Sequence, residues 1–131
     1  TIVIITGDHN ARSIFNYSNS TTSKLQYSVP FYMYLPPSYC ASAEEKEIIE
    51  KRYASHYDIL STIAPLSLKE GTKYLNVGNN ILDTTKQNKD FFSYNEEQII
   101  APEESNKDSL MNVMKSRELI MKLYYQNQIH A

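Results

Sequence analysis

Tryptophan, any possible disulfide and any long apolar run are all missing from this chain of 131 residues. Its single cysteine, Cys40, has no partner within the chain, so the sequence carries no disulfide framework and indicates no redox compartment. No uninterrupted apolar stretch approaches the ~20 residues that a membrane-spanning helix requires. A chain of this length fits one globular domain that buries roughly two-thirds of its unfolded surface.

An excess of positive charge is missing as well. The chain has 13 lysine and arginine residues against 15 aspartate and glutamate residues, which gives a net charge of -2. Domains that bind nucleic acid normally present a basic face, so the sequence predicts no nucleic-acid partner. The basic residues are scattered, and no polybasic block indicates binding to an anionic membrane surface.

The first ten residues carry the strongest functional pattern. The β-branched run of residues 2–5 predicts a strand that is buried on both faces, as in a parallel sheet. Gly7 ends the run, and we expect its conformational freedom to let Asp8 and His9 turn toward one point. A carboxylate oxygen and an imidazole nitrogen that converge there suit a divalent metal ion. The same residues also describe an ordinary strand exit, in which Asp8 caps the next turn and His9 lies in a solvated loop.

Three later segments follow in a recognisable order. They are residues 29–36 (VPFYMYLP), residues 55–63 (SHYDILSTI) and residues 78–82 (GNNIL). With the Thr-Gly-Asp-His exit, they resemble the alkaline phosphatase superfamily, in particular its sulfatase and phosphoglycerol or phosphoethanolamine transferase branch. Ser61 replaces a usual proline, Asn80 a usual aspartate, and Asn10 a frequent glycine.

The resemblance implies a metal-dependent sulfuric-ester hydrolase or phosphoryl-group transferase, with Asp8 and His9 as metal ligands. The metal would bind an oxygen of the sulfate or phosphate ester and activate the nucleophile. Imidazole favours Mn or Zn over Ca, although Ca stays possible. Arg12 and Lys24 are candidate contacts for the anionic substrate, and otherwise are surface cations. Cys40 lacks the Cys-x-Pro-x-Arg context of a sulfatase nucleophile.

We expect this chain to be the carboxyl-terminal part of a longer catalytic domain, because it begins without methionine inside a predicted core strand. The nucleophile and the other ligands would then lie upstream, and the chain alone would be inactive and bind metal weakly. The resemblance further implies a bacterial inner-membrane parent whose catalytic domain lies outside the cytoplasm. The sheet edge left exposed is expected to allow self-association.

The predicted fold class is α/β, the C-terminal part of a three-layer, mostly parallel sulfatase-like sheet with flanking helices. Residues 1–82 form the family-like core, and residues 83–131 form a hairpin plus a closing helix. Within the core we expect a short helix over residues 42–53, a helix with Asp58 as its N-cap, and a loop over residues 69–80. The hairpin joins residues 91–94 to residues 98–102. The closing helix covers residues 108–128, with a core face that comprises Leu110, Val113, Met114, Arg117, Met121 and Tyr124.

Asp58 is expected to have a structural role rather than that of a catalytic acid, because capping explains its position. Two other functions remain open for the whole chain. It could be a non-catalytic interaction module that binds a partner through the hairpin and closing helix, or a purely structural domain.

Overall fold

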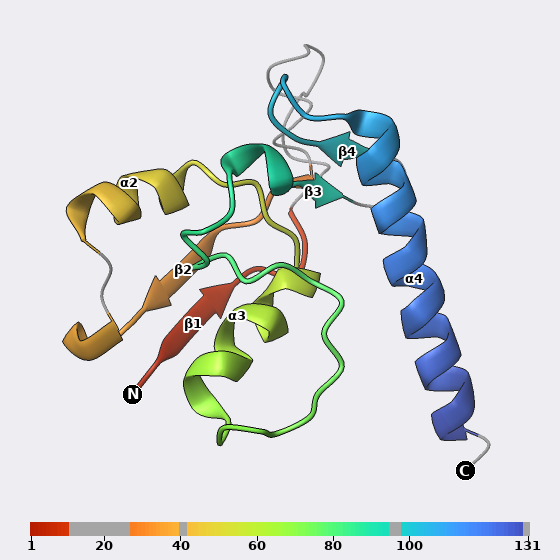
Figure 1. Ribbon diagram of the computed structural model, residues 1–131, viewed down its shortest axis with the longest axis horizontal. Coiled ribbons are helices and arrows are strands. Elements are labelled where there is room, and N and C mark those ends of the chain that lie inside the picture. The colour runs from red at the N-terminus through yellow and green to blue at the C-terminus, as the bar shows by residue number, and fades with distance from the viewer. Residues whose placement is uncertain (11–26, 40–41, 95–97, 130–131) are drawn as a thin grey trace. The chain divides into compact units, whose positions relative to one another are not determined.

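The computed structural model describes residues 1–10, 27–39, 42–94 and 98–129. They form a mixed α/β chain with two small antiparallel sheets and three α-helices among the described residues (Figure 1). The chain divides into two compact units, Thr1–Ala43 and Glu44–Ala131. Each unit is described by itself below.

The first unit contains a two-stranded ribbon. Strand β1 (Val3–Thr6) pairs antiparallel with β2 (Phe31–Tyr34), and Val3 lies opposite Tyr34. Prolines lie on both sides of β2, at positions where they remove no hydrogen bond from the ladder. The predicted parallel pairing is therefore wrong for the described strands. In an antiparallel pair the carbonyl and amide groups of β1 meet those of a strand that runs in the opposite direction.

The expected burial of β1 is also wrong. Val3 keeps 42% of its surface exposed and Ile5 keeps 63%. Both side chains share one face of the ribbon with Tyr32 and Tyr34, which lie opposite them and are also exposed. Side chains of a ribbon point out of the sheet plane, so they stay accessible where no further layer packs on that face.

The second unit contains the three helices and the second sheet. They are α2 (Ala43–Glu50), which begins at the unit boundary, α3 (Tyr57–Ser67) and α4 (Lys107–Ile129), with the antiparallel strands β3 (Ser93–Tyr94) and β4 (Ile99–Ile100). The predicted short helix, hairpin pairing and closing helix are confirmed, while the hairpin turn lies outside the described residues. No helix in the described part of the chain is both long and apolar enough to cross a membrane.

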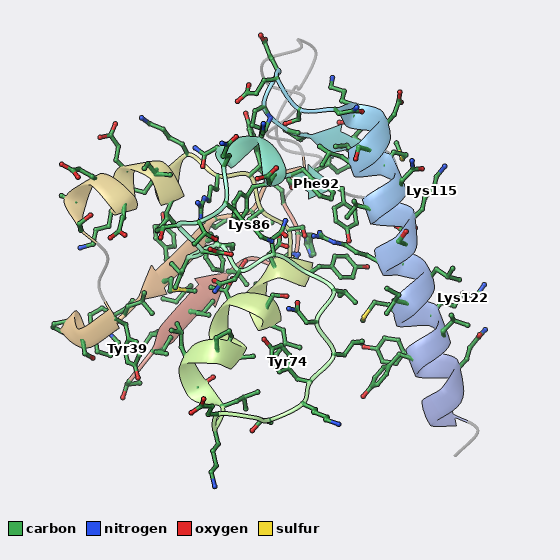
Figure 2. The ribbon with its side chains drawn as sticks, in the orientation of Figure 1. Tyr39, Tyr74, Lys86, Phe92, Lys115 and Lys122 are labelled. Carbon is green, nitrogen blue, oxygen red and sulfur yellow. The ribbon has the colours of Figure 1, made fainter. Side chains whose placement is uncertain are left out.

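The core of the second unit lies between the hairpin and the first half of α4. Phe92, Leu110 and Met114 form it, with Tyr94 and Ile99 packed against them. Figure 2 shows Phe92 between the β3–β4 pair and α4, with Lys115 and Lys122 on the outer side of that helix.

The predicted core face of α4 is only partly confirmed. Leu110, Met114 and Arg117 are buried, but Val113 and Tyr124 are 39% and 43% exposed. The short β3–β4 pair covers only a narrow face of α4, so residues of the helix that lie beside this face remain exposed to solvent.

Candidate metal centre

The exit of β1 is shaped by a close approach of the chain to Gly7. The Gly7 amide donates a hydrogen bond to the Pro30 carbonyl at 3.3 Å, and a Cβ added at Gly7 would lie 3.2 Å from the Val29 Cβ. Gly71 alone among the described glycines has a positive φ. The expectation that Gly7 turns the chain through unusual backbone angles is therefore wrong. Because Gly7 has no side chain, Val29 and Pro30 can pack closely against its backbone.

Asp8 and His9 leave the strand together and orient each other. Asp8 Oδ1 accepts a hydrogen bond from the His9 backbone amide at 2.8 Å. His9 Nδ1 lies 3.4 Å from the Asn10 carbonyl oxygen, which can only accept.

The two atoms not used in these contacts face each other. Asp8 Oδ2 lies 3.7 Å from His9 Nε2, and the side chains are 90% and 72% exposed. The predicted convergence of these two residues is therefore present in the structure. A histidine that contacts a backbone carbonyl through one nitrogen presents the other in the orientation that metal sites use.

The donor set fits a transition-metal ion. Zinc binds carboxylate oxygen and imidazole nitrogen at about 2.0–2.2 Å, so two tetrahedral ligands are separated by roughly 3.3 Å. The observed separation of 3.7 Å is slightly wider, and exposed side chains can close the difference by small rotations. An oxygen and nitrogen donor pair also suits manganese, whereas calcium prefers a shell of oxygens alone.

Two side chains alone would supply only part of the coordination shell of a metal ion. Within the described ranges, no group of three or more His, Cys, Asp or Glu side chains is arranged so that it could hold a metal ion. Two of the predicted functional residues, Arg12 and Lys24, lie outside those ranges, as does Cys40. Whether the two cations approach the Asp8–His9 pair is therefore not part of the described structure.

The second unit holds a buried polar network that the sequence did not reveal. Asp58 is 1% exposed, and its Oδ2 accepts hydrogen bonds from the amide and hydroxyl of Ser55 at 2.8 and 3.2 Å. Its Oδ1 accepts a hydrogen bond from the Asn79 amide at 2.6 Å and lies 3.7 Å from Arg117 Nη1. Three hydrogen bonds and one ion-pair contact therefore surround this carboxylate.

Asp58 is not the N-cap that the sequence predicted. Helix α3 begins at Tyr57 with His56 in the N-cap position, and Asp58 is the second helical residue. The wider expectation of a structural carboxylate fits its burial and its three hydrogen bonds.

The rest of the polar face of α3 holds the following loop in place. Ser61 Oγ donates to Asn76 Oδ1 at 2.5 Å and accepts from the Gly78 amide at 3.1 Å. Thr62 Oγ1 donates to the Asp58 carbonyl and accepts from the Ile81 amide at 3.0 Å. The detectable signal was the spacing of Asp58, Ser61 and Thr62, which puts three polar side chains on one helical face.

Two cations complete the interior of this unit. Arg117 is 7% exposed, and its guanidinium carbon lies 4.9 Å from the centre of the Phe92 ring. Arg52 lies 4.1 Å from the centre of the Phe91 ring and donates to the carbonyls of Ile81 and Lys86. Burial lowers the pKa of Arg52. Arg52 joins segments that are far apart in the sequence, and so does Arg117.

The comparisons with known proteins leave the family open. No family model, no curated protein and no solved structure matches this chain.

Proposed function

We propose that this chain forms part of a metal-dependent sulfuric-ester hydrolase or phosphoryl-group transferase of the alkaline phosphatase superfamily. In this proposal Asp8 and His9 are two ligands of a divalent metal ion, and the remaining ligands and the nucleophile lie outside the described residues. The single observation that carries the proposal is the pairing of Asp8 Oδ2 with His9 Nε2 at 3.7 Å on an exposed strand exit.

The departures from the family pattern are compatible with this assignment. Ser61, in place of a proline, forms hydrogen bonds to Asn76 and Gly78, so the substitution fastens the loop that follows α3. Asn80, in place of an aspartate, accepts a hydrogen bond from the Leu82 amide at 3.0 Å through its side-chain oxygen. An aspartate can accept the same bond. Both substitutions therefore preserve a plausible local structure.

The chemistry of the proposed site follows from the metal. A bound divalent ion polarises an ester oxygen and stabilises the negative charge that develops in the transition state. Mn or Zn is favoured because one ligand is an imidazole. The substrate is then an anionic sulfate or phosphate ester, and Arg12 and Lys24 are proposed as its cationic contacts.

The finer fold and the location belong to the same proposal. The mixed α/β chain would be the C-terminal part of a three-layer sheet, with further strands beside the exposed β1–β2 ribbon. A bacterial inner-membrane parent, with its catalytic domain outside the cytoplasm, is implied by the family resemblance alone.

The test is the activity of a longer protein that contains this sequence. Asp8→Asn and His9→Gln should each lower metal-dependent turnover of an aryl sulfate or aryl phosphate, by about 100-fold or more if each removes one metal ligand. Both side chains are exposed, so the thermal unfolding midpoint should stay unchanged. His56→Gln is the matched control and should retain activity. Full activity in both site variants would overturn the proposal.

A non-catalytic interaction module is the second candidate, and one observation favours it. On α4, Leu119, Ile120 and Leu123 are 57%, 45% and 50% exposed, although they are large and apolar. Exposed apolar side chains that gather on one helix are typical of an interaction surface. If this function is the correct one, Ile120→Asp should abolish partner binding, whereas Asp8→Asn should have no effect on it.

A further inference from the structure

We propose that the packing of Gly7 against Val29 and Pro30, called the exit contact below, positions the two metal ligands. The exit contact fixes the direction in which the chain leaves β1, and it therefore fixes where Asp8 and His9 lie. This inference rests on the proposed function in taking Asp8 and His9 as metal ligands. It leaves the other coordination positions of the ion to the remaining ligands and the substrate.

The register of the ribbon leads directly to the exit contact. Thr6, the last residue of β1, lies opposite Phe31. The same register places Gly7 opposite Pro30, and the Gly7 amide donates to the Pro30 carbonyl at 3.3 Å. Pro30 has no amide hydrogen to donate in return, so one hydrogen bond joins this pair instead of two. The packing of side chains must then supply the rest of the support at this end of the ribbon.

That packing leaves little room for a side chain at Gly7. A Cβ added there would lie 3.2 Å from Val29 Cβ, 3.4 Å from Val29 Cγ1 and 3.6 Å from Pro30 Cδ. The first two distances are shorter than the optimal separation of about 3.5–4.0 Å between carbon atoms. The φ of Gly7 is not positive, so its backbone suits an alanine and the neighbouring side chains oppose one. Gly7→Ala should therefore push Val29 and the exit of β1 apart.

The metal-binding pair is attached to the ribbon through Gly7. Asp8 Oδ1 accepts a hydrogen bond from the His9 amide, Asp8 Oδ2 lies 3.7 Å from His9 Nε2, and His9 Nδ1 lies near the Asn10 carbonyl oxygen. These contacts join neighbours in the sequence, so they orient the pair internally, whereas the exit contact sets its direction relative to the ribbon. A displacement of Gly7 moves both ligands together. Changes just outside the shell of a metal typically weaken its binding by roughly 10–100-fold.

The experiment measures the affinity of the longer protein that contains this sequence for Mn²⁺ and Zn²⁺, by competition with a chelator of known affinity. Gly7→Ala should weaken metal binding by about 10-fold or more, because the added methyl group meets Val29. Val29→Gly should also weaken it, because the exit of β1 loses its support. The double variant, Gly7→Ala with Val29→Gly, should recover most of the lost affinity, because the methyl group then occupies the space that the valine side chain left.

Gly71→Ala is the matched control. An added Cβ at Gly71 meets nothing within 4 Å, and the φ of 82° makes the change costly to the backbone. It should lower the thermal unfolding midpoint and leave the metal affinity unchanged. In the metal-free chain of 131 residues, the NMR signal of the His9 amide, which donates to Asp8 Oδ1, reports the geometry of the pair directly. This signal should move in Gly7→Ala, return toward its original position in the double variant, and stay in place in Gly71→Ala.

The possible contrary results separate this inference from the proposed function. Metal binding that is lost in Asp8→Asn and His9→Gln, but unchanged in Gly7→Ala and Val29→Gly, would overturn the positioning role and leave the proposed ligands intact. The same result would follow from an equal loss of affinity in Gly71→Ala or from a double variant without recovery. If Gly7→Ala does not fold, Val29→Gly, which adds no atom, decides the matter by its affinity. Metal binding that survives Asp8→Asn and His9→Gln would overturn the proposed ligands and the positioning role together.

Discussion

Two aspartates in this chain have opposite environments. Asp8 is exposed at the exit of β1, where it accepts one backbone hydrogen bond and faces the imidazole of His9. Asp58 is buried, and its carboxylate meets donors from Ser55, Asn79 and Arg117. An exposed carboxylate with few hydrogen bonds is open to solvent, whereas a buried one with three hydrogen bonds joins segments of the fold. The number of donors around each group, rather than the residue type, separates the two roles.

The largest expected effect is the difference in the free energy of unfolding between the Asp58→Asn and Asp8→Asn variants. Asp58→Asn leaves the buried Arg117 without its counter-charge, and breaking a buried ion pair in this way costs about 3–5 kcal/mol. Asp8→Asn removes an exposed carboxylate and should change the free energy of unfolding by less than about 0.5 kcal/mol. Urea denaturation followed by circular dichroism measures both values. Equal losses in the two variants would contradict the contrast.

The partner of Asp58 gives the next test. Arg117→Met should lower the free energy of unfolding about as much as Asp58→Asn does, because it leaves the Asp58 charge buried without a counter-charge. Lys115→Met, on the outer side of α4, is the control. In the double variant Asp58→Asn with Arg117→Met, the losses should fall short of additivity by about 0.5–3 kcal/mol. Strict additivity would mean that the two side chains do not interact across their 3.7 Å separation.

A smaller loss of stability is expected at Gly78, where the loop that follows α3 packs against this helix. A Cβ added at Gly78 would lie 2.6 Å from the Tyr57 carbonyl carbon and 2.7 Å from the Asp58 Cα, which are backbone atoms. Gly78→Ala should therefore destabilise the protein by ~1–3 kcal/mol through overpacking. Gly71→Ala is the comparison, because Gly71 has open space around it and a φ of 82°. Its cost should be about 1 kcal/mol, from backbone strain alone.

Removal of the Tyr94 hydroxyl, which lies beside Arg117, should leave the stability of the protein unchanged or raise it. The Tyr94 hydroxyl and Arg117 Nη1 are buried atoms that have no hydrogen-bond partner among the described residues. An unsatisfied buried polar group costs about 1–3 kcal/mol, so Tyr94→Phe should leave stability unchanged or raise it by about 1 kcal/mol. A clear loss of stability would show that the hydroxyl has a partner.

The same tyrosine predicts how stability changes at alkaline pH. Burial raises the pKa of Tyr94 to about 12, although the nearby charge of Arg117 opposes the shift. Between pH ~10 and ~12 the unfolded chain loses this proton while the folded chain keeps it, so stability is retained below pH ~10 and falls above it. Tyr94→Phe should reduce this fall, and denaturant midpoints at several pH values measure it.

The smallest effect is expected at the surface of α2. Lys51 donates to Glu47 at 2.7 Å, and this hydrogen bond lowers the pKa of the Glu47 carboxyl. Both side chains are highly exposed, so solvent screens their attraction. Lys51→Ala should leave the thermal midpoint unchanged within experimental error, which makes it the baseline for the buried pair.

Local patterns predicted the elements better than their environments. The spacing of apolar residues gave α4 to within one residue at each end, and two short apolar runs predicted the β3–β4 pair. Both patterns reflect interactions between near neighbours, which the sequence displays directly. The same kind of reasoning was wrong for β1, because a β-branched run reads the same whether the strand has one sheet neighbour or two.

Helix α3 shows why the environment could not be predicted. Its polar residues Asp58, Ser61 and Thr62 are buried, whereas the apolar Leu60 is 48% exposed. The difference comes from a loop that brings the Asn79 amide to Asp58 across 21 residues of sequence. A long-range hydrogen bond of this kind leaves no periodic signal in the helix itself.

The sequence by itself determined that a carboxylate and an imidazole stand next to each other after a strand that ends in glycine. It also determined the closing helix and the hairpin pairing. The tertiary structure decided that Asp8 and His9 are exposed at the exit of β1 and that Asp58 is buried among hydrogen-bond donors. The physical reason is that adjacency is a covalent property, whereas solvation and hydrogen-bond saturation depend on groups that only folding brings together.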